Sequence, residues 1–407
     1  MLAALEDGVK GGVWFSLIDK VYRPANLLSA WSKSAANDGA AGVDGITIGR
    51  YRRDAEANLA RLAEKLRDGT YCPKAIRRTY IPKSDGKMRP LGIPTVEDRI
   101  VQGAIRQVIE PIFEREFACH SYGFRPGRGC KDALRRVDEL LQGGYRYVVD
   151  ADLKSYFDTI PHEALMRRVA ERVADRRVLA LIRMFLEVKI MEGLQEYHPL
   201  AGAPQGAVLS PLLSNIYLNP LDHLMAERGR EMVRYADDFV ILCRTRQEAE
   251  AALAEVQAWT AQAGLTLHPE KTRIADTHSD GFEFLGYRFD KGRKWPRNKS
   301  KKKLRESLKP WLKRTSGISL SAIIAAINPC LKGWFVYFKH ASRASLAMVD
   351  SWMRMRLRSI LRKRHGGRGR GRGPDHQRWP NAYFGKLGLF SLEEAHRQAC
   401  QSMQMAH

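Results

Sequence analysis

The sequence predicts an α+β fold, in which helices pack on one face of a mainly antiparallel β-sheet. Two observations predict it: helix-like and strand-like segments alternate along the first two thirds of the chain, and two pairs of strand-like segments form hairpins. With 407 residues and a hydrophobic content of 44%, the chain can bury a large core in two or three domains. Disordered and fibrous classes are therefore excluded for most of the chain.

Each element follows from a local pattern. Apolar residues at helical spacing, or Ala-rich stretches, predict helices at 54–67, after Pro94, at 162–188, at 248–263 and at 346–361. Runs of β-branched and aromatic residues predict strands at 79–82, 89–94, 145–153, 232–243 and 281–289, the first two around a turn at 84–86. The helix at 346–361 is amphipathic, with one apolar face and arginines on the other.

The chain is strongly basic, with 68 Lys and Arg against 45 Asp and Glu and a formal charge of +23. Residues 281–407 carry a net +21 of this charge, a pattern typical of proteins that bind polyanions. The run at 291–305 predicts a flexible basic strap between folded parts. The run at 354–372 ends in an Arg/Gly tract that we expect to remain unpacked and to contact phosphates, with a solvated linker as the alternative.

The remaining composition indicates where the protein works. Six scattered cysteines without a C-x-x-C pair predict reduced thiols and no zinc cluster. Apolar runs are short and interrupted by charge, and the first thirty residues lack a signal peptide's apolar core. We therefore expect a cytoplasmic protein that associates with nucleic acid and not with a membrane.

Carboxylates occupy two unusual places in the predicted sheet. Asp150 and Asp152 alternate with apolar residues in one strand, and Asp237 and Asp238 occupy the predicted turn of the hairpin at 232–243. Two like charges make a poorer turn than Asn-Gly, so something should compensate them. If the hairpin pairs beside the strand, Asp152, Asp237 and Asp238 converge on one sheet edge, which suits two Mg²⁺ ions about 3.5–4 Å apart. A solvated turn is the alternative.

The strings YADD at 235–238 and DLKSYFD at 152–158 resemble the reverse transcriptase family. The resemblance continues through blocks at 80–99, 120–129, 203–219, 264–274 and 282–289. The flanking segments LIDKVYRPANLLSAW, LKGWFVYFKHASRASLAMVD and WPNAYFGKLGLFSLEEAH resemble group II intron proteins. This implies a right-hand polymerase with fingers and palm, followed by an α-helical thumb or maturase domain and a short basic DNA-binding tail. The implied boundaries are 1–60 for an N-terminal extension, 61–290 for fingers and palm, 291–365 for the thumb and 366–407 for the tail.

The resemblance also implies roles for single residues. Asp152 and Asp237, with Asp238 as a third, would be the catalytic carboxylates and would hold two Mg²⁺ or Mn²⁺ ions. The nucleotide-binding residues would be Lys83, Arg89, Phe157, Gln205 and Lys271, with Lys87 competing for the role of Lys83. Phe157 would exclude a 2′-hydroxyl, and Lys271 would protonate the departing pyrophosphate. The primer grip would be Phe284, Leu285 and Gly286. Contacts to nucleic acid are expected from Arg125, Arg128, Lys299, Lys301, Lys302, Lys303, Arg354, Arg358, Arg362 and Arg364.

We therefore expect an RNA-directed DNA polymerase that copies group II intron RNA into DNA and assists splicing as a maturase. Its partners would be intron RNA or another RNA template, a DNA or RNA primer, dNTPs and target DNA, while the oligomeric state stays open. The sequence carries no HNH nuclease pattern, so it resembles the shorter class, which would prime from an existing 3′ end. Two alternatives are a related polymerase in phage defence or DNA repair, and an RNA-binding splicing factor without polymerase activity. The intact Asp152, Asp237, Asp238, Arg89 and Gln205 argue against the splicing factor.

Overall fold

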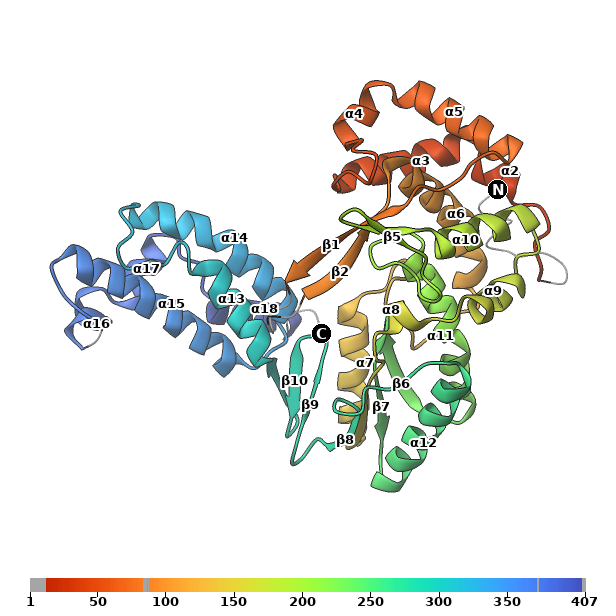
Figure 1. Ribbon diagram of the computed structural model, residues 1–407. Helices are drawn as coiled ribbons and strands as arrows, with labels where there is room; N and C mark the ends of the chain where they lie inside the picture. Colours follow the sequence, from red (N-terminus) through yellow and green to blue (C-terminus); the bar gives the residue numbers. More distant parts are fainter. Residues whose placement is uncertain (1–11, 83–85, 87, 372, 405–407) are drawn as a thin grey trace. The chain divides into compact units, whose positions relative to one another are not determined.

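The structure is a computed structural model, which describes residues 12–82, 86, 88–371 and 373–404 (Figure 1). The chain divides into two compact units, one up to Ile274 and one from Ala275 onward. Each unit combines helices with antiparallel strand pairs, which confirms the α+β class.

The first unit opens with a group of helices and a small sheet. The helices are α2 (Ile18–Val21), α3 (Pro24–Asn37), α4 (Ile48–Arg53), α5 (Ala55–Asp68) and α6 (Val96–Glu114). The sheet runs in the order β2-β1-β4-β5, with β1 (Ile76–Pro82), β2 (Met88–Ile93), β4 (Ile190–Glu192) and β5 (Gln195–Tyr197). Helices α5 and α6 confirm the helices predicted at 54–67 and after Pro94. Buried apolar side chains of α3, α5 and α6 belong to one core.

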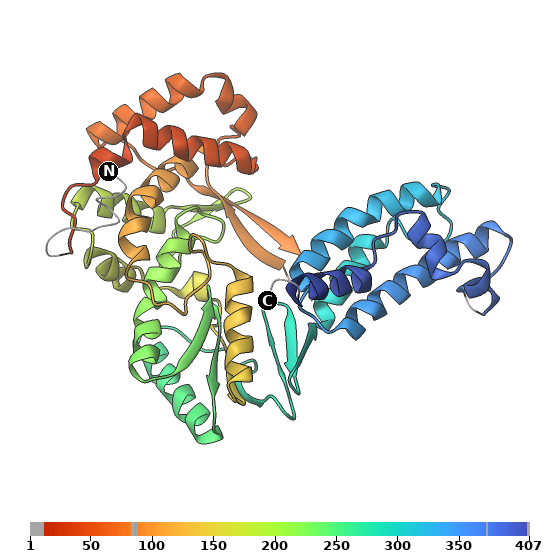
Figure 2. The same cartoon turned by 180° about the vertical axis from the view of Figure 1, so that it is seen from behind.

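A second sheet of the first unit carries the acidic residues. It runs in the order β6-β7-β3-β8, with β3 (Tyr147–Asp152), β6 (Glu231–Tyr235), β7 (Asp238–Cys243) and β8 (Arg273–Asp276). Helices α7 (Cys130–Gln142), α11 (Ser210–Glu227) and α12 (Arg246–Gln262) pack on these strands (Figures 1 and 2). Every residue of β7 after Asp238 is buried, so apolar packing specifies the register of the hairpin.

The segment predicted as one helix at 162–188 is interrupted. It forms α9 (His162–Ala170) and α10 (Arg176–Glu187), which follow the short α8 (Tyr156–Thr159). The interruption is explained by Asp175, whose carboxylate accepts from the Arg177 backbone N–H at 2.9 Å and from the Leu17 N–H at 2.7 Å. Asp175 therefore caps α10 and ties the N-terminal segment to it.

The second unit begins with a three-stranded sheet of β9 (Phe282–Phe284), β10 (Tyr287–Asp290) and β11 (Arg293–Pro296). Its aromatic side chains pack on a helix of the same unit: the Tyr287 hydroxyl donates to the Tyr337 carbonyl at 2.7 Å, and the ring centroids of Tyr287 and Phe338 are 5.0 Å apart. The boundary between units therefore falls at 274/275, earlier than the expected 290/291, because these strands share a core with the helices that follow.

Helices make up the rest of the second unit. They are α13 (Asn298–Leu308), α14 (Leu320–Phe338), α15 (Arg343–Arg364), α16 (Pro374–Arg378), α17 (Asn381–Lys386) and α18 (Leu392–Gln404). The prediction of a flexible strap at 291–305 is wrong, because that run forms β11 and most of α13, whose Leu304 and Leu308 are buried. The tail is also folded: buried Asp350 of α15 accepts from the Leu392 and Glu393 backbone N–H groups at 3.1 Å and so caps α18.

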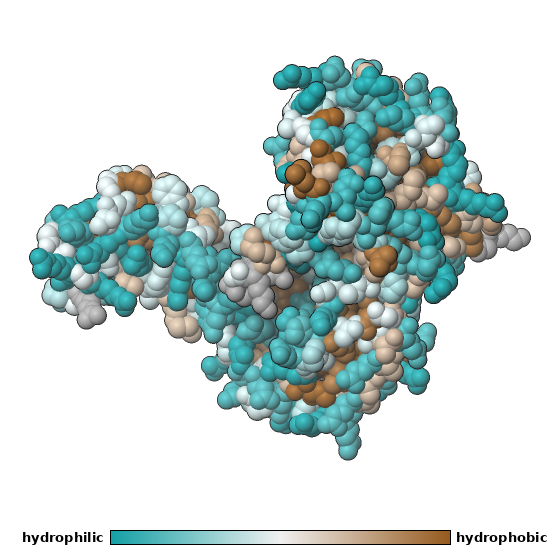
Figure 3. Space-filling view, in the orientation of Figure 1, coloured by the Kyte–Doolittle hydropathy of each residue, from teal (hydrophilic) through white to brown (hydrophobic). Residues whose placement is uncertain are grey.

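The surface is mostly hydrophilic on the face shown in Figure 3, with smaller hydrophobic patches. Within the described part of the chain, α14 is the one helix that is long and apolar enough to cross a membrane, a test that core helices of other proteins also pass. Its buried residues, including Ile323, Ile327 and Leu331, pack inside the second unit.

Candidate active site

The β6–β7 hairpin presents the first acidic residues. Tyr235 of β6 pairs with Asp238 of β7, so the turn consists of Ala236 and Asp237 alone. The expectation that both aspartates occupy the turn is therefore corrected: Asp238 is the first residue of β7. Ala236 has φ = 60°, in the left-handed region that non-glycine residues seldom adopt.

Asp152 lies at the end of β3, directly across the sheet from Asp238. The loop before β8 follows the end of β3: the Lys154 N–H donates to the Thr266 carbonyl at 2.8 Å, and the His268 N–H donates to the Asp152 carbonyl at 2.7 Å. This pairing brings the Lys271 ammonium to 2.5 Å from an Asp152 carboxylate oxygen. The structure thus brings together Asp152, Asp238 and Lys271, although Lys271 is 119 positions away in sequence.

The electrostatic environment of Asp237 differs from that of a free carboxylate. Burial raises the pKa of its carboxyl above the ordinary value, and the negative charge of Asp152 raises this pKa further. The positive charges of Arg89 and Arg234 lower it in part. Asp237 therefore loses its proton less readily than a solvated aspartate, and an added cation at this edge would favour the ionised form.

The donor chemistry at this edge fits a divalent cation. Carboxylate oxygens are the ligands that Mg²⁺ and Mn²⁺ prefer, and the mutual repulsion of Asp152 and Asp237 is relieved by positive charge. Among the described residues, however, no three His, Cys, Asp or Glu side chains are arranged closely enough to form a metal cluster. The assignment of Asp152, Asp237 and Asp238 as metal ligands stays a prediction.

A second constellation joins β2, the loop before α11 and α8. The Arg89 guanidinium donates to the Gln205 side-chain oxygen at 3.1 Å, and the Gln205 amide nitrogen donates to Asp158 at 3.2 Å. The loop is fixed to β2 because the Gly92 N–H donates to the Gln205 carbonyl at 2.6 Å. Asp158 was not singled out from the sequence, although it is the last residue of DLKSYFD and could have been found there. Lys83 and Lys87 lie outside the described residues.

Phe157 is half-buried beside this constellation. Its carbonyl accepts from the Ala203 N–H at 2.7 Å, and its ring meets the rings of Tyr156 and Phe124 edge-on, with centroids 5.5 and 6.5 Å away. The backbone bond and the two rings hold the Phe157 side chain in one orientation. Its predicted role as a sugar gate stays a prediction.

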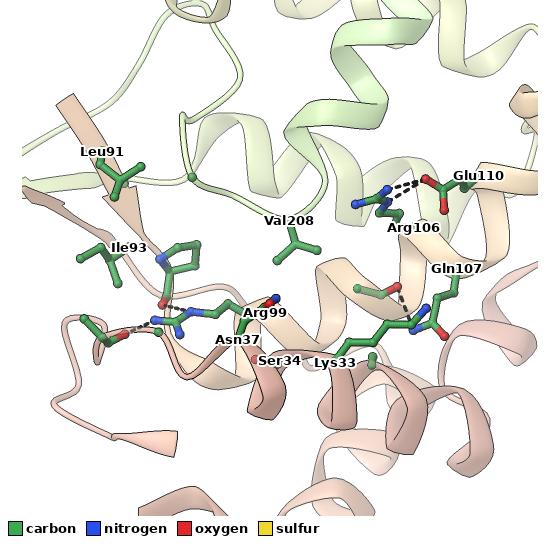
Figure 4. A pocket seen from close by; sticks show the side chains of 17 residues that line it. Lys33, Ser34, Asn37, Leu91, Ile93, Arg99, Arg106, Gln107, Glu110 and Val208 are labelled. Atoms are coloured by element: carbon green, nitrogen blue, oxygen red, sulfur yellow. Dashed lines mark hydrogen bonds and ion pairs between the residues drawn. The ribbon is translucent and has the colours of Figure 1, made fainter. Parts of the chain in front are cut away.

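A cavity of about 550 Å³ lies between α3, β2 and α6 (Figure 4). Its lining includes Gly206, which follows Gln205, and the cationic side chains of Lys33, Arg99 and Arg106. Arg106 is paired with Glu110 at 2.6 Å, and Arg99 donates to the Pro94 carbonyl at 3.0 Å. The acidic residues of β3 and β7 do not line this cavity, so it is distinct from the carboxylate edge.

Two arginines that the sequence assigned to nucleic acid have contacts within the protein. The guanidinium of Arg125 is buried and donates to Glu114 at 2.9 Å and to the Ala118 and Ser121 carbonyls at 2.7 and 2.8 Å. Arg128 is half-buried, donates to the Cys119 carbonyl and lies over the Tyr122 ring. Arg125 therefore braces its own loop instead of facing solvent, which corrects its expected role.

The predicted primer-grip residues lie in the second unit: Phe284 ends β9, and Leu285 and Gly286 form the turn between β9 and β10. Phe284 is buried, while Leu285 and Gly286 have φ of 44° and 83°. The Tyr337 hydroxyl donates to the Leu285 carbonyl at 2.8 Å, and the Arg297 N–H donates to the Gly286 carbonyl at 3.0 Å. The turn is thus anchored by its own unit, and its contact with a primer stays a prediction.

The basic residues of the second unit divide into two groups. Lys299, Lys302 and Lys303 are exposed on α13, and Lys301 is half-buried there. The arginines of α15 have partners within the unit: Arg354 is 3.8 Å from Asp350, Arg362 pairs with Asp375 at 2.7 Å, and Arg364 donates to the Ser316 and Ile318 carbonyls. Arg358 is buried and donates to the Trp379 carbonyl at 2.9 Å and to Asn381 at 2.8 Å. The expected nucleic-acid contact of Arg358 is therefore corrected to a role in packing.

Comparison with known families covers both units. The family described as reverse transcriptase (RNA-dependent DNA polymerase) matches residues 81–289, and the family described as group II intron, maturase-specific domain matches residues 301–379. Protein YkfC of Escherichia coli (strain K12) is 36% identical over 318 residues, which cover 67% of this chain and 82% of YkfC. Group II intron-encoded protein LtrA of Lactococcus lactis subsp. cremoris is 38% identical over 216 residues, which cover 53% of this chain and 36% of LtrA.

Proposed function

Because the chain belongs to the reverse transcriptase family, with a maturase-specific region of the group II intron type, we propose that it copies RNA into DNA and assists intron splicing. The observation that carries the proposal is the facing pair of Asp152 and Asp238, with Asp237 in the adjoining two-residue turn. A carboxylate edge of this kind suits attack by a primer 3′-hydroxyl on the α-phosphate of a dNTP.

The metal is part of the proposal. Asp152, Asp237 and Asp238 would hold divalent cations, Mg²⁺ or Mn²⁺, which supply Lewis-acid charge beside the reacting phosphates. Lys271, which pairs with Asp152, would lend a proton to the leaving group and would balance carboxylate charge before the substrate binds.

The remaining residues would bind and orient the nucleotide. Arg89 presents a guanidinium whose planar fork suits phosphate oxygens, and its bond to Gln205 limits the directions in which it can point. Phe157, packed against Phe124 and Tyr156, would leave no room for a 2′-hydroxyl and so favour dNTPs. Binding of this kind supplies orientation, which is a large part of catalysis in phosphoryl and nucleotidyl transfer.

Primer extension on an RNA template tests the polymerase proposal. The wild type should incorporate dNTPs, whereas Asp152→Asn and Asp237→Asn should each lose about 10³-fold or more in rate. Asp150→Asn is the matched control, because Asp150 lies on the same strand and pairs with Val240 instead of with an acidic residue. Its rate should stay within about threefold of the wild type. Equal incorporation by Asp237→Asn and the wild type would refute the assignment.

The splicing role can be separated from copying. The Asp237→Asn protein should still stimulate splicing of a group II intron RNA, because the maturase-specific match lies in residues 301–379. A protein that copies RNA but leaves splicing of that RNA unchanged would overturn the maturase half of the proposal.

A further inference from the structure

Arg234 is a completely buried arginine that lies three residues before Asp237. Its side chain is 0% exposed, as is that of Asp222, its ion-pair partner. Moving a guanidinium from water into a protein interior is energetically unfavourable, and replacing a buried ion pair by apolar residues is often neutral or stabilising. Stability alone is therefore a weak reason for a charge at this position of a β-strand.

The guanidinium donates in two directions. On one side, Nε donates to an Asp222 carboxylate oxygen at 2.7 Å and Nη2 donates to the other. On the other side, Nη1 donates to the Asn215 side-chain oxygen at 2.9 Å and to the Ala236 carbonyl at 2.9 Å. Asp222 and Asn215 both belong to α11, so one side chain links that helix to the turn between β6 and β7.

The bond to the Ala236 carbonyl acts on Asp237 directly. A peptide group is planar, so the direction of the Ala236 carbonyl determines the direction of the Asp237 N–H and limits where the Asp237 side chain can point. Ala236 itself is in the left-handed region, a conformation that is unfavourable for a non-glycine residue. Such a turn persists only where its surroundings hold it.

The opposite side of the turn is closed by backbone. The Asn215 amide, held by Arg234, donates to the Gly123 carbonyl at 2.8 Å. A methyl group at Gly123 would come within 2.2 Å of the Ala236 backbone nitrogen, so the two segments are in close contact. Arg234 also pairs by its backbone with this loop, through the Tyr122 N–H at 2.8 Å. Arg234 and Gly123 therefore enclose the turn from both sides.

We propose that Arg234 is a positioning residue, which holds the Ala236–Asp237 peptide so that the Asp237 carboxylate faces the reacting phosphates. The proposal rests on the polymerase function proposed above and adds a residue that does not touch substrate. Lysine cannot replace arginine here, because one ammonium cannot donate to Asp222, Asn215 and Ala236 in the planar geometry of a guanidinium.

Steady-state kinetics of Arg234→Lys provide the first test. We expect kcat for dNTP incorporation to fall about 100-fold, while KM for dNTP and affinity for template–primer stay within about threefold, because orientation is lost and binding is kept. Arg230→Met is the matched control: Arg230 pairs with Glu255 at 2.8 Å beside the other end of β6, so its loss removes an ion pair without touching the turn. Its kcat should stay within about threefold of the wild type.

Two measurements separate positioning from loss of folding. Hydrogen–deuterium exchange of residues 235–239 should rise in Arg234→Lys at a temperature where circular dichroism shows the protein to be folded. In Arg234→Ala, millimolar guanidinium should restore part of kcat, whereas methylammonium should not and Arg230→Met should not respond. If the Arg234→Ala protein does not fold, the kinetics and hydrogen–deuterium exchange of Arg234→Lys alone test the inference.

A folded Arg234→Lys protein with the kcat and exchange pattern of the wild type would overturn the inference, as would a rise in KM at unchanged kcat. Failure of the polymerase proposal looks different, because the wild type would then incorporate no dNTP at all.

Discussion

At the scale of single residues, charge and backbone conformation decide what the carboxylate edge can do. Asp237 combines a raised pKa with a place in a two-residue turn, whereas Asp152 has Lys271 as its counter-ion. The turn depends on its neighbours, since Ala236 adopts a left-handed conformation that the sequence YADD alone does not favour. Substitutions beside this turn should therefore change kcat more than they change the affinity for dNTP.

Gly123→Ala is the residue-scale prediction. The added methyl would come within 2.2 Å of the Ala236 nitrogen and 2.8 Å of the Tyr235 carbonyl carbon, and backbone atoms must shift to accept it. We expect kcat to fall about 100-fold by displacement of Asp237. Gly129→Ala in the same loop is the control, because its methyl meets nothing closer than 3.9 Å, and it should keep wild-type kcat. If the two variants had the same kcat, the close contact of Gly123 with Ala236 could not be the cause of the loss in kcat.

At the scale of elements, short connections between strands and helices assemble the site. The chain Arg89, Gln205, Asp158 joins β2, the loop before α11 and α8, and it orients the Gln205 amide because Asp158 only accepts while Arg89 only donates. The Gln205 amide can therefore make the hydrogen bonds to Arg89 and Asp158 together in one orientation.

Asp158→Ala should free the Gln205 amide and with it the Arg89 guanidinium. We expect KM for dNTP to rise about tenfold, the equivalent of one lost hydrogen bond to a charged group, with kcat changed less. In Asp158→Asn the side-chain oxygen still accepts from Gln205, so KM should stay within about threefold of the wild type. Steady-state kinetics check both, and an Asn variant as impaired as the Ala variant would argue that the carboxylate has another role.

The charge of Arg358 is buried, although the basic sequence of its helix suggests that it is exposed. It lies in a basic helix, yet its guanidinium is buried beneath α17 and lies over the Phe384 ring. Arg358→Met should lower the free energy of unfolding by about 3 kcal/mol, because two hydrogen bonds to a charged group are lost. The salt dependence of RNA binding should not change. Chemical denaturation checks the first outcome, with exposed Lys303→Met as a control that leaves stability unaltered.

At the scale of the whole molecule, the basic charge is concentrated in residues 281–407, which carry a net +21 of the total +23. Some of these basic side chains have partners inside the second unit: Arg362 of α15 pairs with Asp375, and Arg364 donates to the Ser316 carbonyl. The exposed lysines of α13 remain available to phosphates, so counterion release should depend on them.

Replacing Lys299, Lys302 and Lys303 together by Gln tests this. The slope of the logarithm of RNA affinity against the logarithm of salt concentration should become shallower by about 3, one for each lost phosphate contact. Replacing the exposed Arg50, Arg52 and Arg53 of α4 removes the same charge elsewhere and should leave the slope unchanged. Filter binding over a range of salt concentrations measures both, and equal slopes for wild type and the lysine variant would remove α13 from the binding surface.

The sequence by itself determined the class of fold and most elements, because periodicity and turn chemistry are local properties, and the spacing of its motifs predicted the acidic residues. It placed Asp152 and the YADD hairpin correctly in strands that pair. Only the tertiary structure decided which charges face solvent. Arg125, Arg358 and Arg234 differ little from other arginines in sequence, but segments far away in the chain bury them and supply their acceptors. Likewise Lys271 reaches Asp152 because a loop pairs with the end of β3, and such pairing depends on the packing of the whole unit and not on any local run of residues.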